Sequence, residues 1–280
     1  MSTWRLVVEY EGTRYRGWQE QHNTPRTVAG ALRRALEGAG CEVEELMGSG
    51  RTDAGVHALA QVAHLRGRFR GSPEGLRLAV NDQLPHDVHV LALETAADRF
   101  HARHHALLRS YLYQVARRRT ALAKPFVWWV RDPLDAGRMA QAAALLSGMH
   151  DFRNFCEQPA AQTSTRVKVS SAEVAEEGAL VLVRLVASHF LWKMIRRLVG
   201  TLVEVGAGRL TPSDVVALLD AEATVSDAAS PALHTAPPSG LFLERVLYPG
   251  DPPLGSLRSV TPIADEPRQG GRRSQRDRHR

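Results

Sequence analysis

The feature that most constrains the fold is the order in which two hydrophobic periodicities follow one another along the chain. Runs that alternate apolar and polar residues predict strands, and runs with a period of about 3.6 predict amphipathic helices. Strands outnumber helices and follow one another without regular βα alternation, so we predict an α+β fold. The predicted strands are 4–10, 57–65, 88–94, 109–116, 166–174, 180–187 and 240–247, and the predicted helices are 28–38, 138–147 and two that start near Phe190 and Thr211.

The same pattern predicts how the chain divides. A chain of 280 residues is long enough for two domains with sizeable cores. The pattern changes after Pro133, so we expect one α+β half at 1–132 and a second at 133–250. Six arginines and one aspartate stand between 268 and 280. We expect 251–280 to be a poorly ordered Arg-rich tail that adds at most weak, salt-sensitive attraction to nucleic acid.

Composition excludes several classes of protein. Hydrophobic residues make up 44% and charged residues 24% of the chain, as in folded soluble proteins, which argues against a disordered or fibrous chain. Cys41 and Cys156 are far apart and in no metal-ligand spacing, so we expect neither a disulfide framework nor a metal site. The N-terminus lacks signal-peptide features, and no apolar run reaches about 18 residues. We therefore expect a cytoplasmic protein without membrane contact.

A basic segment lies inside the predicted folded body. Residues 99–119 carry six arginines and no acidic residue, which indicates a polyanionic partner. Strand alternation places Arg109, Tyr111, Tyr113 and Arg117 on one face of this segment. Such a face can stack bases and hold phosphates, but a half-buried strand with packed tyrosines has the same pattern. The spacing leaves both interpretations open.

A glycine-rich loop surrounds Asp53 directly before a predicted strand. Residues 48–58 read GSGRTDAGVHA. The glycines permit a tight turn and let another backbone or a substrate come close. The aspartate is either a functional carboxylate or a turn-former that bonds its own backbone. The segment lacks the Lys-Ser or Lys-Thr ending and the following helix of a phosphate-binding loop.

A third group of candidates lies on the helix predicted from Phe190 to Gly206. Lys193, Arg196 and Gly200 share one side of that helix. Cations beside a mid-helix glycine indicate that an acidic group approaches closely. We expect Arg197, by contrast, to lie on a solvated basic face.

Several motifs stand in a fixed order between about residues 4 and 249. They are YEGTRYRGWQ at 10–19, GRTDAGVHA at 50–58, FHAR at 100–103, SYLY at 110–113, FLWKMIRRLVGTLVEVG at 190–206 and SGLFL at 239–243. With these motifs the sequence resembles the bacterial tRNA pseudouridine synthase A family. The run that starts at Arg51 and includes Asp53 is the most specific of them.

The resemblance implies an isomerase that needs no cofactor and no metal. It implies that the enzyme converts uridine to pseudouridine at positions 38, 39 and 40 in the anticodon stem-loop of tRNA. It also implies a two-lobed pseudouridine synthase fold, with a mostly antiparallel central sheet flanked by helices and an active-site cleft completed by the C-terminal half. The partners implied are tRNA and a second copy of the chain in a homodimer.

The resemblance also implies roles for single residues. Two positions depart from the family pattern: Trp192 and Lys193 stand where many relatives have His or Gln, and Ser239 replaces the usual Glu. The departure at Lys193 adds a cation that is a candidate to share the role of Arg196. The implied roles are a catalytic carboxylate for Asp53, an aromatic contact to the target uracil for Tyr111, the partner of Asp53 for Arg196, an apolar wall for Leu241 and displacement of the target base for Arg51.

Two other classes of function fit the same features. An RNA-binding protein without catalysis would use the same stacking and basic residues and would yield no modified product. A carboxylate-dependent nucleosidase or glycosidase would release free base, although no local spacing supplies a second carboxylate near Asp53.

Overall fold

The computed structural model describes residues 1–220, 223 and 226–265. It is an α+β structure, as predicted. The strands are β1 (Ser2–Tyr10), β2 (Glu42–Gly48), β3 (His57–Arg68), β4 (Val88–Thr95), β5 (Leu108–Ala116), β6 (Trp128–Trp129), β7 (Gly148–Asp151), β8 (Arg166–Glu177), β9 (Leu180–Ala187) and β10 (Leu241–Leu247). The helices are α1 (Val28–Gly38), α2 (Pro73–Gln83), α3 (Ala136–Ala144), α4 (Met194–Gly206) and α5 (Pro212–Leu219).

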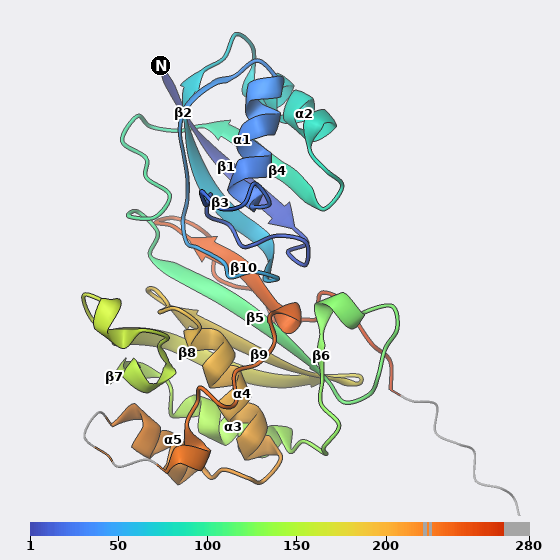
Figure 1. Ribbon diagram of the computed structural model, residues 1–280, viewed down its shortest axis with the longest axis vertical. Coiled ribbons are helices and arrows are strands. Elements are labelled where there is room, and N and C mark those ends of the chain that lie inside the picture. The colour runs from blue at the N-terminus through green and yellow to red at the C-terminus, as the bar shows by residue number, and fades with distance from the viewer. Residues whose placement is uncertain (221–222, 224–225, 266–280) are drawn as a thin grey trace, which may run out of the picture.

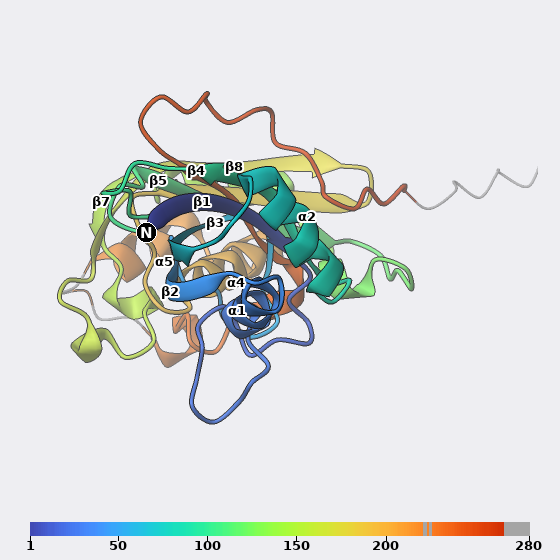
Figure 2. The same cartoon turned by 90° about the horizontal axis from the view of Figure 1, so that it is seen from above.

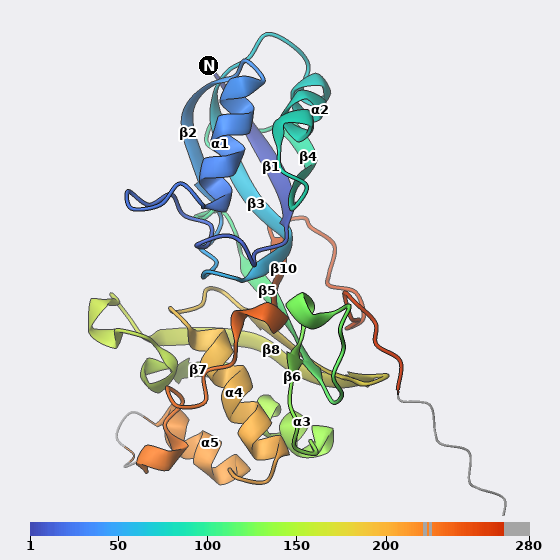
Figure 3. The same ribbon diagram turned by 45° about the vertical axis from the view of Figure 1, so that its right-hand side comes forward.

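One sheet runs through the whole molecule (Figure 1). Its strand order is β4-β1-β3-β10-β5-β9-β8-β7, with β2 paired to β3 and β6 paired to β5. Within the described residues β10–β3 and β5–β6 are parallel and the other strand pairs are antiparallel, which confirms the mostly antiparallel sheet. Helices α1 and α2 lie over one end of the sheet, and α3, α4 and α5 lie over the other (Figure 3).

The last strand joins the two ends of the sheet. β10, the last strand in the sequence, lies between β3 and β5 and pairs with both of them. Without β10 these two strands of the N-terminal half would not be joined in one sheet. The division of the chain at residue 132 stays a prediction, since the sheet is continuous across it. The loop that carries Asp53 leads into β3 beside β10, and this places it at the centre of the molecule.

The two faces of the sheet are covered by different parts of the chain. Tyr113 and Val183 face the main core, on the side where α1 and α4 lie (Figure 2). On the opposite face Leu112 and Leu182 are buried together with Ile263 of the C-terminal segment. Strands β5 and β9 thus carry buried apolar side chains on both faces, and each face is covered by another part of the chain.

The C-terminal segment up to residue 265 is structured, in contrast to the expectation from its composition. The backbone N–H of Val260 donates to Oε1 of Gln114 at 2.7 Å, and that of Ala179 donates to the carbonyl of Ile263 at 2.8 Å. These bonds and the burial of Ile263 hold the segment against the sheet. The six arginines predicted as a tail between 268 and 280 lie outside the described residues.

Gly200 is the point where another segment crosses helix α4. A Cβ atom built on Gly200 would lie 1.5 Å from the carbonyl oxygen of His234. The backbone N–H of Ala236 donates to the carbonyl of Arg196 at 3.0 Å, so the crossing segment is bonded to the helix. The close approach predicted at this glycine is present, but the group that approaches is the chain's own backbone and not an acidic ligand.

We expect Gly200→Ala to destabilise the protein by about 3 kcal/mol, at the upper end of typical overpacking costs, because the methyl group and a backbone carbonyl cannot both fit. Urea denaturation compares it with the wild type. Gly255→Ala is the control, since among the described residues no atom beyond its two chain neighbours lies within 4 Å of the corresponding Cβ. Equal midpoints for Gly200→Ala and the wild type would contradict the tight crossing.

Candidate active site

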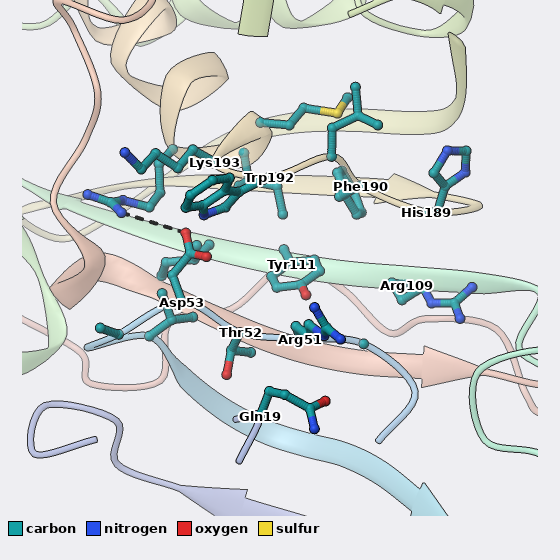
Figure 4. A pocket seen from close by; sticks show the side chains of 18 of the residues that line it. Gln19, Arg51, Thr52, Asp53, Arg109, Tyr111, His189, Phe190, Trp192 and Lys193 are labelled. Atoms are coloured by element: carbon teal, nitrogen blue, oxygen red, sulfur yellow. Dashed lines mark ion pairs between the residues drawn. The ribbon is translucent and has the colours of Figure 1, made fainter. Parts of the chain in front are cut away.

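A pocket of about 810 Å³ opens where the Asp53 loop, β5, the segment before α4 and the start of β10 meet (Figure 4). Its walls combine one carboxylate with a set of cations. Among the described residues that line it, Asp53 is the acidic one. The cationic lining residues are Arg16, Arg51, Arg103, Arg109, Lys193 and Arg196. The excess of positive charge suits a polyanion.

Glycines shape the loop that presents Asp53. Gly17 has a φ of +95°, and a Cβ atom on it would lie 2.4 Å from the carbonyl oxygen of Thr52. The N–H of Trp18 donates to that same carbonyl at 3.1 Å, which ties the 11–27 loop to the Asp53 loop. The Thr52 hydroxyl and the Tyr10 hydroxyl are 2.8 Å apart in a buried hydrogen bond. These bonds to Trp18 and Tyr10 fix the backbone of the loop, and the Asp53 side chain lies in the pocket.

The side chain of Asp53 pairs with Arg196, as the resemblance implies. Nη1 of Arg196 lies 3.6 Å from Oδ2 of Asp53. Nε of Arg196 donates to the carbonyl of Ala236 at 2.7 Å, so the guanidinium is oriented by the segment that crosses α4. The partner of the Asp53 side chain is therefore an arginine on a distant helix, which favours a functional carboxylate over a local turn-former.

Two opposing effects act on the pKa of Asp53. Burial raises it above its ordinary value, while the charges of Arg196 and Lys193 lower it. Burial is the larger effect, so the net direction is upward. The side chain is still 29% exposed, through the pocket. The carboxylate is reachable, and its charge depends on the cations beside it.

Lys193 and Arg197 share a different acidic partner, Glu157. Nζ of Lys193 lies 2.9 Å from Oε1 of Glu157, and Nη2 of Arg197 bonds to Oε2. The expectation that Arg197 lies on a solvated face is wrong: it is buried, and Nη1 also donates to the carbonyl of Cys156 at 2.6 Å. Lys193 acts on Asp53 through space, whereas Arg196 contacts it directly.

The two tyrosines of β5 have different surroundings. Tyr113 is fully buried and its hydroxyl donates to the carbonyl of Pro237 at 2.7 Å, which is a structural role. Tyr111 lines the pocket, and its ring meets that of Phe190 edge to face at 5.2 Å. Within the described part of the chain the Tyr111 hydroxyl has no hydrogen-bond partner. Burial, and then the charge of Asp53, raise its pKa, so the phenol is neutral.

Arg109 is a structural member of the same strand face. Its guanidinium donates to four backbone carbonyls, those of Ser49, Arg103, Ala106 and Ser188. These carbonyls belong to segments that all line or border the pocket. Arg109 therefore fixes the pocket wall, so the strand face predicted from alternation mixes core, scaffold and pocket residues.

The remaining predicted residues also lie at the pocket. Leu241, at the start of β10, is 4% exposed and lines it. Arg51 is exposed and lines the pocket together with Tyr111 (Figure 4). Sequence reasoning assigned no role to Arg16, Arg103 or Trp192, which line the pocket too. All three stand inside the motifs quoted above, and this position in the motifs is the sequence signal that could have identified them.

Over the described residues no group of three or more His, Cys, Asp or Glu side chains is placed to hold a metal ion. No helix among them has the length and apolar character required to cross a membrane.

Comparison with known proteins identifies the family. A family model described as "tRNA pseudouridine synthase" matches residues 6–104 and 142–249. The chain belongs to the tRNA pseudouridine synthase family. A tRNA pseudouridine synthase A of Allorhizobium ampelinum is 41% identical over 256 residues, which cover 90% of this chain and 96% of that protein.

Two further relatives extend the match to other bacteria. The tRNA pseudouridine synthase A of Agrobacterium fabrum is 40% identical over 254 residues, or 89% of this chain and 93% of that protein. The one of Moorella thermoacetica is 40% identical over 248 residues, or 87% and 98%. Membership of the pseudouridine synthase family makes the chain an isomerase that acts on uridine in tRNA.

The reaction of a pseudouridine synthase matches what the pocket contains. The N1–C1′ bond of uridine breaks, the uracil turns, and a C5–C1′ bond forms. C5 loses a proton and N1 gains one, so the product is an isomer of the substrate. A carboxylate can assist this exchange by attacking as a nucleophile or by stabilising positive charge that develops at the sugar.

Proposed function

We propose that this enzyme converts uridine to pseudouridine at positions 38, 39 and 40 in the anticodon stem-loop of tRNA. The observation that carries the proposal is the Asp53–Arg196 pair, set in a cationic pocket beside Tyr111. The choice of the anticodon arm is supported by the motifs that the chain shares with the tRNA pseudouridine synthase A family. We place the reaction in the cytoplasm and assign it to a homodimer on the same basis.

Asp53 is the catalytic carboxylate in this proposal. It acts in its charged form, whether it attacks C1′ or the uracil ring. Burial raises the pKa of Asp53, and the charge of Arg196 opposes this effect and favours the charged form. Tyr111 contacts the uracil, and its neutral hydroxyl lies near where the C5 proton leaves.

The target uridine must leave the base stack to reach Asp53. Arg51, exposed at the pocket and unpaired among the described residues, fills the space left by the displaced base. Leu241 forms the apolar wall against the uracil, and Lys193 supplies additional positive charge. The exposed cations Arg16 and Arg103 contact the RNA backbone.

Tritium release tests the proposal directly. In tRNA labelled at C5 of uridine, isomerisation transfers the C5 proton to solvent, so we expect the wild-type protein to release tritium. Mapping of the product should place the modified residues at positions 38–40. Tight tRNA binding without release would instead indicate a binding protein, and release of free uracil would indicate a nucleosidase.

A further inference from the structure

Trp192 is the most exposed aromatic side chain in the pocket. It is 44% exposed, whereas Tyr111 is 7% exposed and Phe190 is partly buried against it. An aromatic ring that is exposed inside a cationic pocket is placed to stack on a base of a bound nucleic acid. The ring of Trp192 therefore offers an open aromatic face inside a cationic pocket.

The edge of the same indole faces Asp53. In Figure 4 the ring nitrogen of Trp192 points toward the carboxylate, and this N–H lowers the pKa of Asp53. An indole N–H is a donor only, so beside a carboxylate it favours the charged form of that group. Arg196, in the first turn of α4, and Trp192, just before this helix, thus both favour the charged form of Asp53.

A fixed turn sets the position of Trp192. The next residue, Lys193, has a φ of +60°, a left-handed conformation that a non-glycine residue adopts only where its surroundings enforce it. Glu157 provides this enforcement: its N–H donates to the carbonyl of Trp192 at 2.9 Å and its Oε1 accepts from Nζ of Lys193 at 2.9 Å. The same turn ends the extended segment, so α4 begins at Met194 and not at Phe190 as the periodicity predicts.

We infer that Trp192 positions the Asp53 carboxylate with its N–H and stacks a base of the substrate RNA, next to the displaced uridine, on its open face. The inference rests on the proposed function, because it assumes RNA in the pocket. Aromatic side chains stack on any base, and Lys193, whose Nζ lies 5.5 Å from the ring centroid, attracts the adjoining phosphate.

Two substitutions separate the two roles. Trp192→Phe keeps an aromatic face and loses the N–H, and Trp192→Ala loses both. Trp129→Phe is the matched control, since Trp129 is similarly exposed at 38% and lies in β6, outside the pocket. The readouts are the dissociation constant for an anticodon stem-loop RNA, the pH profile of tritium release from tRNA, and the melting temperature of each variant.

We expect Trp192→Phe to bind the stem-loop within about twofold of wild type and Trp192→Ala to bind about tenfold more weakly, the scale of one lost stacking contact. In both variants Asp53 loses a donor that favours its charged form, so the acid limb of the pH profile moves to higher pH. Trp129→Phe should match the wild type in both readouts. A purely structural role would lower the melting temperature without moving the pH profile.

Each part of the inference has its own contradicting result. A wild-type pH profile in Trp192→Phe would overturn the positioning role. Wild-type affinity in Trp192→Ala would overturn the stacking role. A wild-type protein that binds the stem-loop and releases no tritium would instead contradict the proposed function, and the affinities of the two variants would still test the stacking.

Discussion

Asp53→Asn is expected to abolish tritium release from tRNA, with the rate falling by about three orders of magnitude or more, while the protein stays folded. Removing a nucleophile or an equivalent charged group typically has an effect of this size, because no neighbouring side chain replaces it. Asp53 is the one acidic residue among the described residues that line the pocket, so no other carboxylate can take over. RNA affinity should change little, since the cations remain.

The stability of Asp53→Asn distinguishes a catalytic carboxylate from a structural one. Burial raises the pKa of Asp53 in the folded protein above its unfolded value, so its charge opposes folding at neutral pH. The stability it contributes is present below the unfolded pKa and is lost as the pH rises through the folded pKa. Asparagine stays neutral at every pH. We therefore expect the variant to be at least as stable as wild type at pH 7 and to lose this advantage as the pH falls through the folded pKa of Asp53 toward its unfolded value.

The control for this prediction is Asp82→Asn, on the exposed side of α2. It removes the same charge outside the pocket and should leave the rate unchanged. Full activity in Asp53→Asn would reject the catalytic assignment. Loss of activity together with a fall in melting temperature would indicate that Asp53 mainly holds the loop.

The sequence predicted the catalytic candidates better than it predicted their neighbours. Asp53 and Arg196 stand in motifs whose order resembles one family, and the structure brings them into contact. Arg197 follows Arg196 directly, yet it is buried against Glu157. Helical spacing alone cannot distinguish the two arginines, because their partners come from other segments.

Elements were missed where local signals were weak or mixed. β2 contains Glu42, Glu44 and Glu45 and is partly exposed, so it lacks a clear apolar alternation. For α2 the signal was present: Ser72 caps the helix by accepting from the N–H of Gly75, and a proline follows at the first turn. Its apolar face is narrow, with Leu76 and Val80 as its buried residues.

The C-terminal segment 249–265 shows a different limit. Its few apolar residues, among them Leu257, Val260 and Ile263, have no period that would predict an element. They are nevertheless placed to cover the second face of the sheet. That face carries apolar side chains of β5 and β9 that must be buried. The reason for the order of the C-terminal segment therefore lies in distant strands and cannot be read from the segment's own sequence.

The second large effect is expected for Arg196→Gln, with a loss of about a hundredfold or more in the rate at neutral pH. Glutamine has no charge, so less of the effect of burial on the pKa of Asp53 is offset and the charged form is less favoured. The acid limb of the pH profile therefore moves to higher pH. The bond from Nε to the carbonyl of Ala236 is lost as well, which loosens the segment that leads to Leu241.

Two comparisons make this prediction specific. Arg138→Gln breaks an ion pair of the same length, 3.6 Å, but there both side chains are more than half exposed, so solvent screens the pair and the rate should not change. Lys193→Gln should move the acid limb in the same direction by a smaller amount, because Nζ of Lys193 is bound to Glu157 and acts on Asp53 only through space. A larger effect for Lys193→Gln than for Arg196→Gln would make Lys193 the main partner of the carboxylate. An unmoved pH profile in Arg196→Gln would show that the guanidinium does not control the charge of Asp53.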